Sequence, residues 1–170
     1  QILPLVPPGS GWSPYSTWAS LLGNALLISL EDLVMNELLV DNDLPNIGTI
    51  GKYVDYDASI SLKKPLLDKA ACALIAGRGS HTYLSAFSSL KLSNNSWVQE
   101  AAVFHLLELE FGQSWWKWPD AYRWRDSDAM ENFRQKNAYK IEMFIAQQSM
   151  FYVQWNLLKN FANSKGINLI

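Results

Sequence analysis

The chain has 170 residues, of which 49% are hydrophobic and 18% charged, and its formal net charge is −2. This length and composition predict one folded domain with a hydrophobic core and exclude extensive disorder. Acidic and basic residues are mixed throughout, so nothing indicates a nucleic-acid partner or a membrane partner, and no apolar run approaches the roughly 18 residues that span a bilayer.

The N-terminal segment predicts a strand followed by a loop. Residues 2–6 are apolar and end at two successive prolines, which a central strand does not tolerate, so we expect a short buried strand there. Residues 9–15 contain glycine, serine and proline and are predicted to form a loop. A short helix is expected over 16–22, with Gly23 as its stop.

The next elements are predicted to be helical with one irregular interval. Ser29 and Asp32 have the spacing of a capping box, which predicts a helix to about Leu39. Residues 41–59 are rich in turn formers. Apolar residues at spacings of four then predict a helix over 61–76.

The second half of the chain is also predicted to be mainly helical. Helices are expected over 80–90, 95–112 and 126–165, and the last has a break near Asn137. Between them, the aromatic segment 115–119 is predicted to be non-helical.

Residues 167–170 are predicted to form a second strand. The order strand, helical excursion, long helix and strand is that of one βαβ unit with a large insertion after its first strand. Both strands are expected to be buried on two faces, which is typical of a parallel sheet. The fold class predicted from the pattern is therefore α/β.

Patterns typical of metal, nucleophile or phosphate chemistry are absent from the sequence. Cys72 is the single cysteine, which excludes an internal disulfide framework and favours a reducing compartment. With His81 and His105 it has no metal-ligand spacing. The sequence also lacks a nucleophile elbow and a phosphate-binding glycine loop.

Neighbouring acidic residues do not predict a catalytic carboxylate pair. Glycoside chemistry needs two carboxyl groups about 5 to 9 Å apart across a sugar. The acidic pairs of this chain instead diverge on a helix or lie at helix starts, where they complement the helix dipole: Glu108 and Glu110, Glu31 and Asp32, Asp126 and Asp128. No catalytic residue is predicted.

Eight tryptophans in 170 residues are an unusually large share. One interpretation is core packing between helices. The other is sugar binding, because flat aromatic faces match the C–H faces of pyranose rings. Composition does not choose between the two.

Several segments together resemble the 4-α-glucanotransferases (amylomaltase or disproportionating enzyme, glycoside hydrolase family 77). The sequence of these segments looks most similar to that of the plastid-type disproportionating enzyme. The segments are similar, in order, to the family's first barrel strand and loop, its W-x-W-P segment, its first long barrel helix and the approach to its second strand: Leu3-Pro-Leu5, Ser13-Pro-Tyr15, Gly23-Asn24 with Leu27-Ile-Ser29, Trp115-Trp-Lys-Trp-Pro119 with Arg123, Phe144-Ile-Ala-Gln-Gln148 with Gln154-Trp155, and Ala162 to Ile170.

The resemblance implies an incomplete (β/α)8 TIM barrel over residues 1–170. In it, 1–6 is the first strand, 7–125 the active-site loop and helical insertion, 126–165 the long helix and 167–170 the start of the second strand. The whole enzyme is expected to transfer α-1,4-glucan segments between maltooligosaccharides by a retaining mechanism that needs no cofactor. The resemblance also implies a plastid location, with a cytoplasmic one otherwise.

The segments that carry the family's catalytic Asp and Glu residues have no counterparts in these 170 residues. We therefore expect the chain to be an incomplete sequence that is inactive by itself. The alternatives are a non-catalytic glucan-binding or interaction module, and an unrelated helical scaffold whose tryptophans only pack. The sequence predicts no oligomeric state.

The substrate-binding residues implied by the resemblance are Tyr15, Ser13 and Asn24. Tyr15 would border the donor sugar or else anchor the loop. Ser13 would give the sugar a hydrogen bond or else cap a turn. Asn24 follows a glycine and more often satisfies loop backbone. Trp12 and Trp18 are expected to widen the glucan surface.

Overall fold

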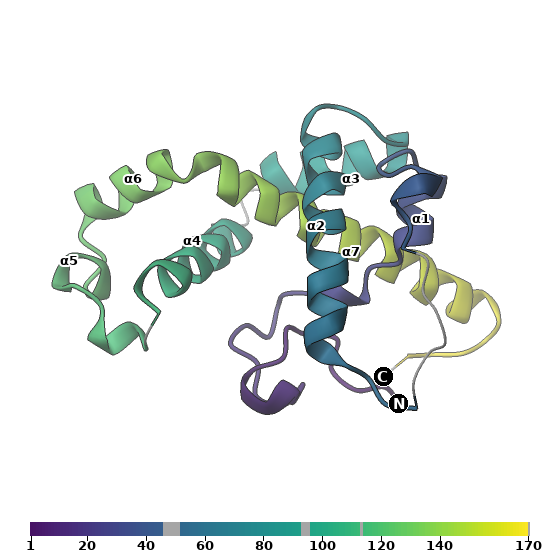
Figure 1. Cartoon of the computed structure of the whole chain (residues 1–170), viewed down its shortest axis with the longest axis horizontal. Coiled ribbons are helices and arrows are strands. Elements are labelled where there is room, and N and C mark those ends of the chain that lie inside the picture. The colour runs from purple at the N-terminus through teal and green to yellow at the C-terminus, as the bar shows by residue number, and fades with distance from the viewer. Residues whose placement is uncertain (46–51, 93–95, 113, 170) are drawn as a thin grey trace.

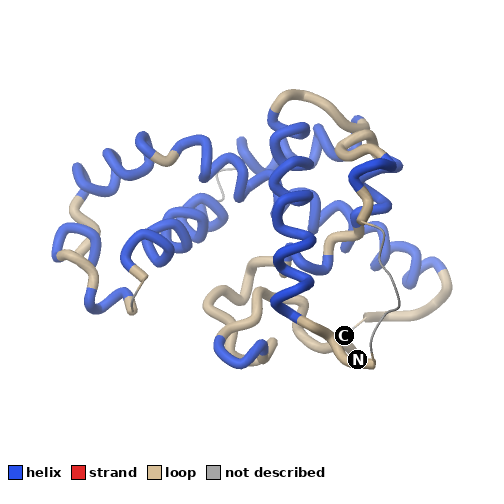
Figure 2. Tube along the Cα trace, in the orientation of Figure 1, coloured by secondary structure: helices blue, strands red, loops and turns tan. Residues whose placement is uncertain are grey.

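The computed structural model describes residues 1–45, 52–92, 96–112 and 114–169, and within these ranges the regular structure is entirely helical (Figure 2). The elements are short 3-10 turns (η) and α-helices, in the order η1 Ser10–Trp12, η2 Ala25–Leu27, α1 Leu30–Met35, η3 Asp41–Asp43, α2 Tyr56–Ile75, α3 His81–Leu92, α4 Ser96–Phe111, η4 Trp115–Lys117, α5 Asp120–Arg123, α6 Ser127–Lys136 and α7 Ala138–Ser164.

The two strands expected at 2–6 and 167–169 are not formed in the described residues, so the strands of the predicted α/β fold are absent from the part of the chain that the structure describes. A strand requires a hydrogen-bonded neighbour. Segment 2–6 is instead hydrogen-bonded to a loop. The backbone N–H of Asn24 donates to the Leu5 carbonyl at 2.8 Å. Ile170 lies outside the described residues.

The long helix α7 is the central element of the fold (Figure 1). Helices α2, α3 and α4 all pack on it. Ala70, Ala71 and Ala73 of α2 and Ala146 of α7 are fully buried, and such small side chains allow helix axes to approach closely. We call the part built on α1, α2, α3 and α7 the body.

Helices α4, α5 and α6 extend away from the body as an arm (Figure 1). The arm has a hydrophobic cluster of its own, whose buried members are Val103, Leu107, Trp118, Met130 and Phe133. Ile141 of α7 packs against both this cluster and the core of the body. The arm is therefore packed internally and joined to the body through the start of α7 and through α4.

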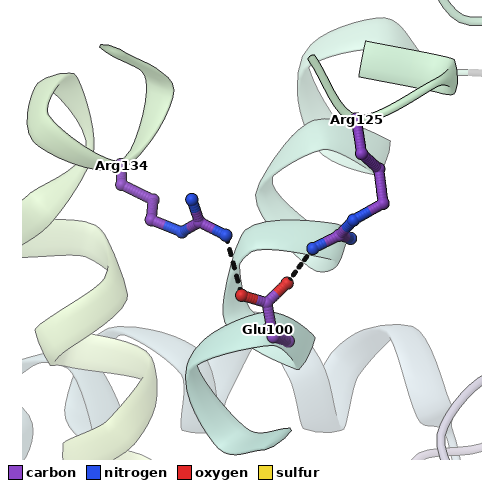
Figure 3. Close-up of polar contacts among 3 residues, drawn as sticks. All are labelled: Glu100, Arg125 and Arg134. Atoms are coloured by element: carbon purple, nitrogen blue, oxygen red, sulfur yellow. Dashed lines mark hydrogen bonds and ion pairs between the residues drawn. The ribbon is translucent and has the colours of Figure 1, made fainter. Parts of the chain in front are cut away.

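A three-residue ion cluster adds to the arm (Figure 3). Glu100 of α4 accepts a hydrogen bond from Arg134 of α6 at 2.7 Å and a second from Arg125, which lies between α5 and α6. Each carboxylate oxygen thus binds one arginine, and the three segments of the arm are held together at one point.

Several helix boundaries differ from those expected. The helix predicted over 16–22 is absent, because the Thr17 hydroxyl bonds to the backbone of Ala19 and stabilises a turn instead. Helix α1 starts at the predicted Ser29 cap but ends at Met35, before Glu37 adopts a positive φ of 63°. Asp55 caps α2 earlier than predicted. The expected break at Asn137 is present between α6 and α7.

Candidate substrate-binding loop

Residues Gly9–Ser29 form the N-terminal loop, which holds all three predicted site residues. Its first part turns back on itself, with the Ser13 carbonyl accepting hydrogen bonds from Gly9 N and Ser16 N at 3.4 and 3.3 Å. A Cβ atom on Gly9 would lie 1.6 Å from the Ser16 carbonyl oxygen, so only glycine permits this approach.

Tyr15 is the most exposed of the predicted site residues, with 75% of its surface accessible. Ser13 is half-buried, and its Oγ accepts a hydrogen bond from the Tyr15 backbone N–H at 3.2 Å. The Ser13 side chain therefore shapes the turn that presents Tyr15. An exposed phenol on a defined turn offers a flat face and one hydroxyl, which suits binding rather than proton transfer.

Asn24 caps η2. Its Oδ1 accepts from Leu26 N at 3.0 Å, and its backbone N–H donates to Leu5. The side-chain oxygen thus satisfies loop backbone, as the sequence favoured. The structure brings Ser13 and Tyr15 together and places Asn24 at the base of the loop.

A buried glutamine of α7 holds the loop at Gly23. Gln148 is 3% exposed, its Oε1 accepts from Gly23 N at 2.9 Å, and its Nε2 donates to Gly23 O at 3.0 Å. The amide therefore pairs with both backbone groups of one residue, as a neighbouring strand would. A Cβ on Gly23 would come within 1.9 Å of the Phe151 ring, so glycine is required for the loop to lie this close to α7.

A second glutamine repeats the arrangement six residues later. Gln154 Oε1 accepts from Ser29 N at 2.7 Å and its Nε2 donates to Ser29 O at 3.1 Å. Both pairs are separated by 125 positions, so the segment Gly23–Ser29 runs along α7 in a fixed register. Gln154 also donates to Asp32, which accepts a hydrogen bond from Tyr83.

Buried polar groups around these glutamines are paired with one another. Tyr83 is 1% exposed, and its burial, reinforced by the hydrogen bond to Asp32, raises the pKa of its hydroxyl. Lys63 of α2 donates to the carbonyls of Leu26 and Ile28, both at 2.6 Å, and partial burial lowers its pKa. The loop is therefore held from α7 on one side and from α2 on the other.

Trp12 and Trp18 pack against helices and are not fully exposed to solvent. The Trp12 ring stacks on Tyr56 with centroids 4.6 Å apart, and Trp18 stacks on His105 of α4 at 5.4 Å. Both are half-buried. Their placement favours the packing interpretation for these two tryptophans, and they anchor the loop to α2 and α4.

The two larger of the cavities near the loop differ in their lining. The first, of ≈ 370 Å³, is apolar and lies between residues 2–6, Leu22 and the α7 residues Phe151 and Trp155. The second, of ≈ 540 Å³, lies between α2, α4 and α7 and is lined in part by His105. Ser13, Tyr15 and Asn24 line neither cavity.

His105 and Cys72 are placed where they do not form a metal site. Within the described ranges no group of three or more His, Cys, Asp or Glu side chains could hold a metal ion. Burial, with Lys64 nearby, lowers the pKa of His105. The Cys72 thiol contacts the Tyr139 hydroxyl at 3.1 Å.

The positioning glutamines were missed by the sequence reasoning. In the sequence, Gln148 and Gln154 belong only to the helix segment that resembles the family, and nothing there predicts their pairing with Gly23 and Ser29. The available signal was a polar amide within a run of apolar helix positions, since a buried amide requires partners.

Sequence comparison identifies relatives of one kind. A family model described as 4-alpha-glucanotransferase matches residues 1–170. The chloroplastic/amyloplastic 4-alpha-glucanotransferase of Oryza sativa subsp. japonica is 39% identical over 177 residues, which cover 100% of this chain and 29% of the rice protein. The 4-alpha-glucanotransferase of Streptococcus pneumoniae serotype 4 is 32% identical over 174 residues, covering 100% of this chain and 34% of the bacterial protein.

Structural comparison agrees. The amylomaltase from Streptococcus agalactiae, solved in complex with acarbose, superimposes with a TM-score of 0.84 and 30% sequence identity. The match covers 96% of this chain and 33% of that protein. The chain thus spans about a third of the length of these relatives.

Proposed function

Because this chain belongs to the 4-alpha-glucanotransferase family, we propose that it is part of an enzyme that transfers α-1,4-glucan segments between maltooligosaccharides. The family resemblance inferred from the sequence is confirmed. The observation that carries the proposal is the family match over residues 1–170, supported by the structural likeness to an amylomaltase. A retaining reaction of this class uses two carboxylates and no cofactor.

We further propose that the chain contributes the first part of an incomplete (β/α)8 barrel. Apolar side chains that are exposed in this chain support that view, because other parts of a folded protein normally cover such side chains. They are Ile2 and Leu3 in the expected first strand, Leu157, Leu158 and Phe161 on the last turns of α7, and Ile167 beyond it. The rest of the barrel would supply the strands that pair with residues 2–6 and 167–170.

Within such an enzyme, the N-terminal loop would border the donor sugar. Tyr15 would lie against the sugar ring, and Ser13 would hold the turn that presents it, with its hydroxyl also available as a sugar contact. Asn24 would act through the loop backbone and, by the resemblance, on the substrate. The exposure of Tyr15 and the hydrogen bond between Ser13 and Tyr15 N support these roles.

A plastid location is proposed from the relatives, three of which are chloroplastic/amyloplastic enzymes of Oryza sativa, Arabidopsis thaliana and Solanum tuberosum. Among the described helices, none is long and apolar enough to cross a membrane.

The proposal is tested by following maltotriose conversion to glucose and longer glucans. The whole protein is expected to catalyse it, and the 170-residue chain by itself is expected not to. In the whole protein, Tyr15→Ala should lower kcat/KM by about tenfold, the effect of losing about 1.4 kcal/mol of transition-state binding. Tyr15→Phe keeps the ring and should retain most activity.

Two results would overturn parts of this proposal. Maltotriose conversion by the isolated chain would show that these residues hold a complete site. An unchanged kcat/KM for Tyr15→Ala would remove Tyr15 from the donor site. The glucan-binding module remains the alternative, and it predicts saturable maltodextrin binding with no conversion by any form of the protein.

A further inference from the structure

We propose that the arm carries an accessory glucan-binding patch formed by Trp115, Trp116, Trp124 and Arg123, separate from the N-terminal loop. The proposal rests on the proposed function for its ligand class, an α-1,4-glucan chain. It assigns to the patch the holding of glucan polymer, not any step of the transfer reaction. We call these four residues the arm patch.

The arm patch is a concentration of open aromatic surface. Trp115, Trp116 and Trp124 are 49%, 55% and 70% exposed. Tryptophan is the largest apolar side chain, and a group of three left open to solvent is typical of an interaction site. By contrast, Trp118 in the same segment is 6% exposed and belongs to the core of the arm.

The exposed rings present flat faces in different directions. Trp115 and Trp116 meet edge to face, with centroids 5.9 Å apart and an interplanar angle of 86°. The Arg123 guanidinium lies 4.6 Å above the Trp124 ring. Faces at right angles suit a helical glucan, whose successive sugar rings change direction along the chain.

A shallow pocket lies beside Trp115 and links it to Arg123. This pocket, of ≈ 240 Å³, is lined by Trp115, Trp118, Tyr122, Arg123, Arg125 and two apolar residues of α4. Arginine N–H groups donate to hydroxyl oxygens, and ring faces cover sugar C–H groups, so the lining matches a neutral polyol. Arg123 pairs with Asp120 at 3.9 Å and Arg125 pairs with Glu100, and each of these ion pairs uses one nitrogen of a guanidinium that carries five N–H donors.

The arm patch rests on a packed support. Tyr122 contacts Phe111 and Phe133 with ring centroids 5.2 and 5.8 Å apart, and these rings join α5 to α4 and α6. Arg125 is fixed by Glu100, which also binds Arg134 (Figure 3). Ring faces that are held in place lose little conformational entropy when a ligand binds.

The arm patch and the N-terminal loop are different surfaces. The arm patch belongs to η4 and the end of α5 at the far end of the arm, whereas the loop lies beside α2 and α7 and reaches the arm only at α4, through Trp18, among the described contacts (Figure 1). No residue of the loop lines the pocket beside Trp115. A glucan polymer bound at the arm patch would therefore leave the donor site free for a short substrate.

The experiment uses the whole protein and two substrates. Binding of soluble amylose is measured by affinity electrophoresis, and maltotriose conversion is measured in the same preparations. Because losing one hot-spot side chain weakens binding by about fivefold or more, Trp116→Ala and Trp124→Ala should each raise the amylose dissociation constant by that factor. Maltotriose kcat/KM should stay within about twofold of the wild-type value.

The control is Met35→Ala, which removes a side chain 82% exposed on α1. It should change neither readout. A second pair of variants, Trp116→Tyr and Trp124→Tyr, keeps a flat ring and should retain most of the amylose affinity, which separates ring stacking from a loss of folding.

Each outcome is decisive. Unchanged amylose affinity in both alanine variants overturns the arm patch while maltotriose conversion upholds the proposed function. Parallel losses of both readouts also overturn it, because they would place these tryptophans at the donor site or in the fold. A change of oligomeric state with unchanged amylose affinity would identify the patch as a protein contact and overturn the proposal. Loss of maltotriose conversion in the wild type would refute the proposed function itself.

Discussion

The body and the arm are stabilised in different ways. In the body, two side-chain amides of α7 bind the backbone of the N-terminal loop: the buried Gln148 pairs with Gly23, and the half-buried Gln154 pairs with Ser29. In the arm, a small aromatic cluster and a partly exposed ion cluster around Glu100 hold three short helices. Pairing of side-chain amides with the backbone fixes one register of the loop along α7. Ring packing and partly exposed ion pairs tolerate changes in the positions of the arm helices. The body therefore suits a site that needs defined geometry, and the arm suits a surface that binds a polymer.

The most severe test of this difference is Gly23→Ala in the body. The new Cβ would lie 1.9 Å from the Phe151 ring, so either the ring or the loop must move. We expect unfolding free energy to fall by about 3 kcal/mol, the upper part of the range for overpacking. Denaturant unfolding followed by circular dichroism measures it.

The matched control for this substitution is Gly112→Ala at the end of α4. Gly112 has a φ of +58°, and no described heavy atom lies within 4 Å of the position that a Cβ would take there. The cost at this position is only the left-handed backbone conformation, about 1 kcal/mol. Equal losses for the two variants would mean that the loop and α7 are not held as closely as the contact between Gly23 and Phe151 implies.

A smaller effect is expected from Gln148→Leu. Leucine fills a similar volume but leaves the Gly23 N–H and C=O without partners in a buried place, which costs about 2 kcal/mol. The adjacent Gln147→Leu is the control, because Gln147 is half-buried and its amide bonds to Asp68 at the surface of α2. Its loss should stay below about 1 kcal/mol. Thermal unfolding of the two variants, compared with the wild type, gives the answer. Equal melting temperatures would show that water satisfies Gly23.

The helices of both regions were largely predictable from local patterns. The Ser29 cap, the end of the helix predicted over 61–76 and the break at Asn137 each rest on a few neighbouring residues, and all are present. The expectation at 16–22 was wrong because the Thr17 hydroxyl competes for local backbone groups. The strands at 2–6 and 167–170 were not formed because a strand is a property of a pair of segments, and the sequence of one segment does not supply its neighbour.

The site was predictable only in part for the same reason. The turn at Ser13 and Tyr15 and the loop role of Asn24 follow from residue type and spacing. The pairing of Gln148 with Gly23 joins residues 125 positions apart, and no local pattern contains it. The distinction between buried Trp118 and exposed Trp116 likewise depends on how α4 and α6 pack around η4, which composition does not specify.

The smallest expected effect lies in the arm and depends on pH. Burial by itself raises the pKa of Glu100, but the hydrogen bonds from Arg125 and Arg134 outweigh it and lower that pKa below its ordinary value of 4.5. A carboxyl group with a lowered pKa in the folded state stabilises the fold above about pH 4.5, and this contribution is lost as the pH falls through the folded-state pKa.

Glu100→Gln should therefore lower stability by less than about 1 kcal/mol at pH 7, because the cluster is partly exposed. It should also flatten the decline below pH 4.5, whereas Glu108→Gln, at an exposed position on the same helix, should keep the wild-type pH profile. Circular dichroism and tryptophan fluorescence across a pH titration follow the acid transition, and an unchanged transition in Glu100→Gln would assign the decline to other groups.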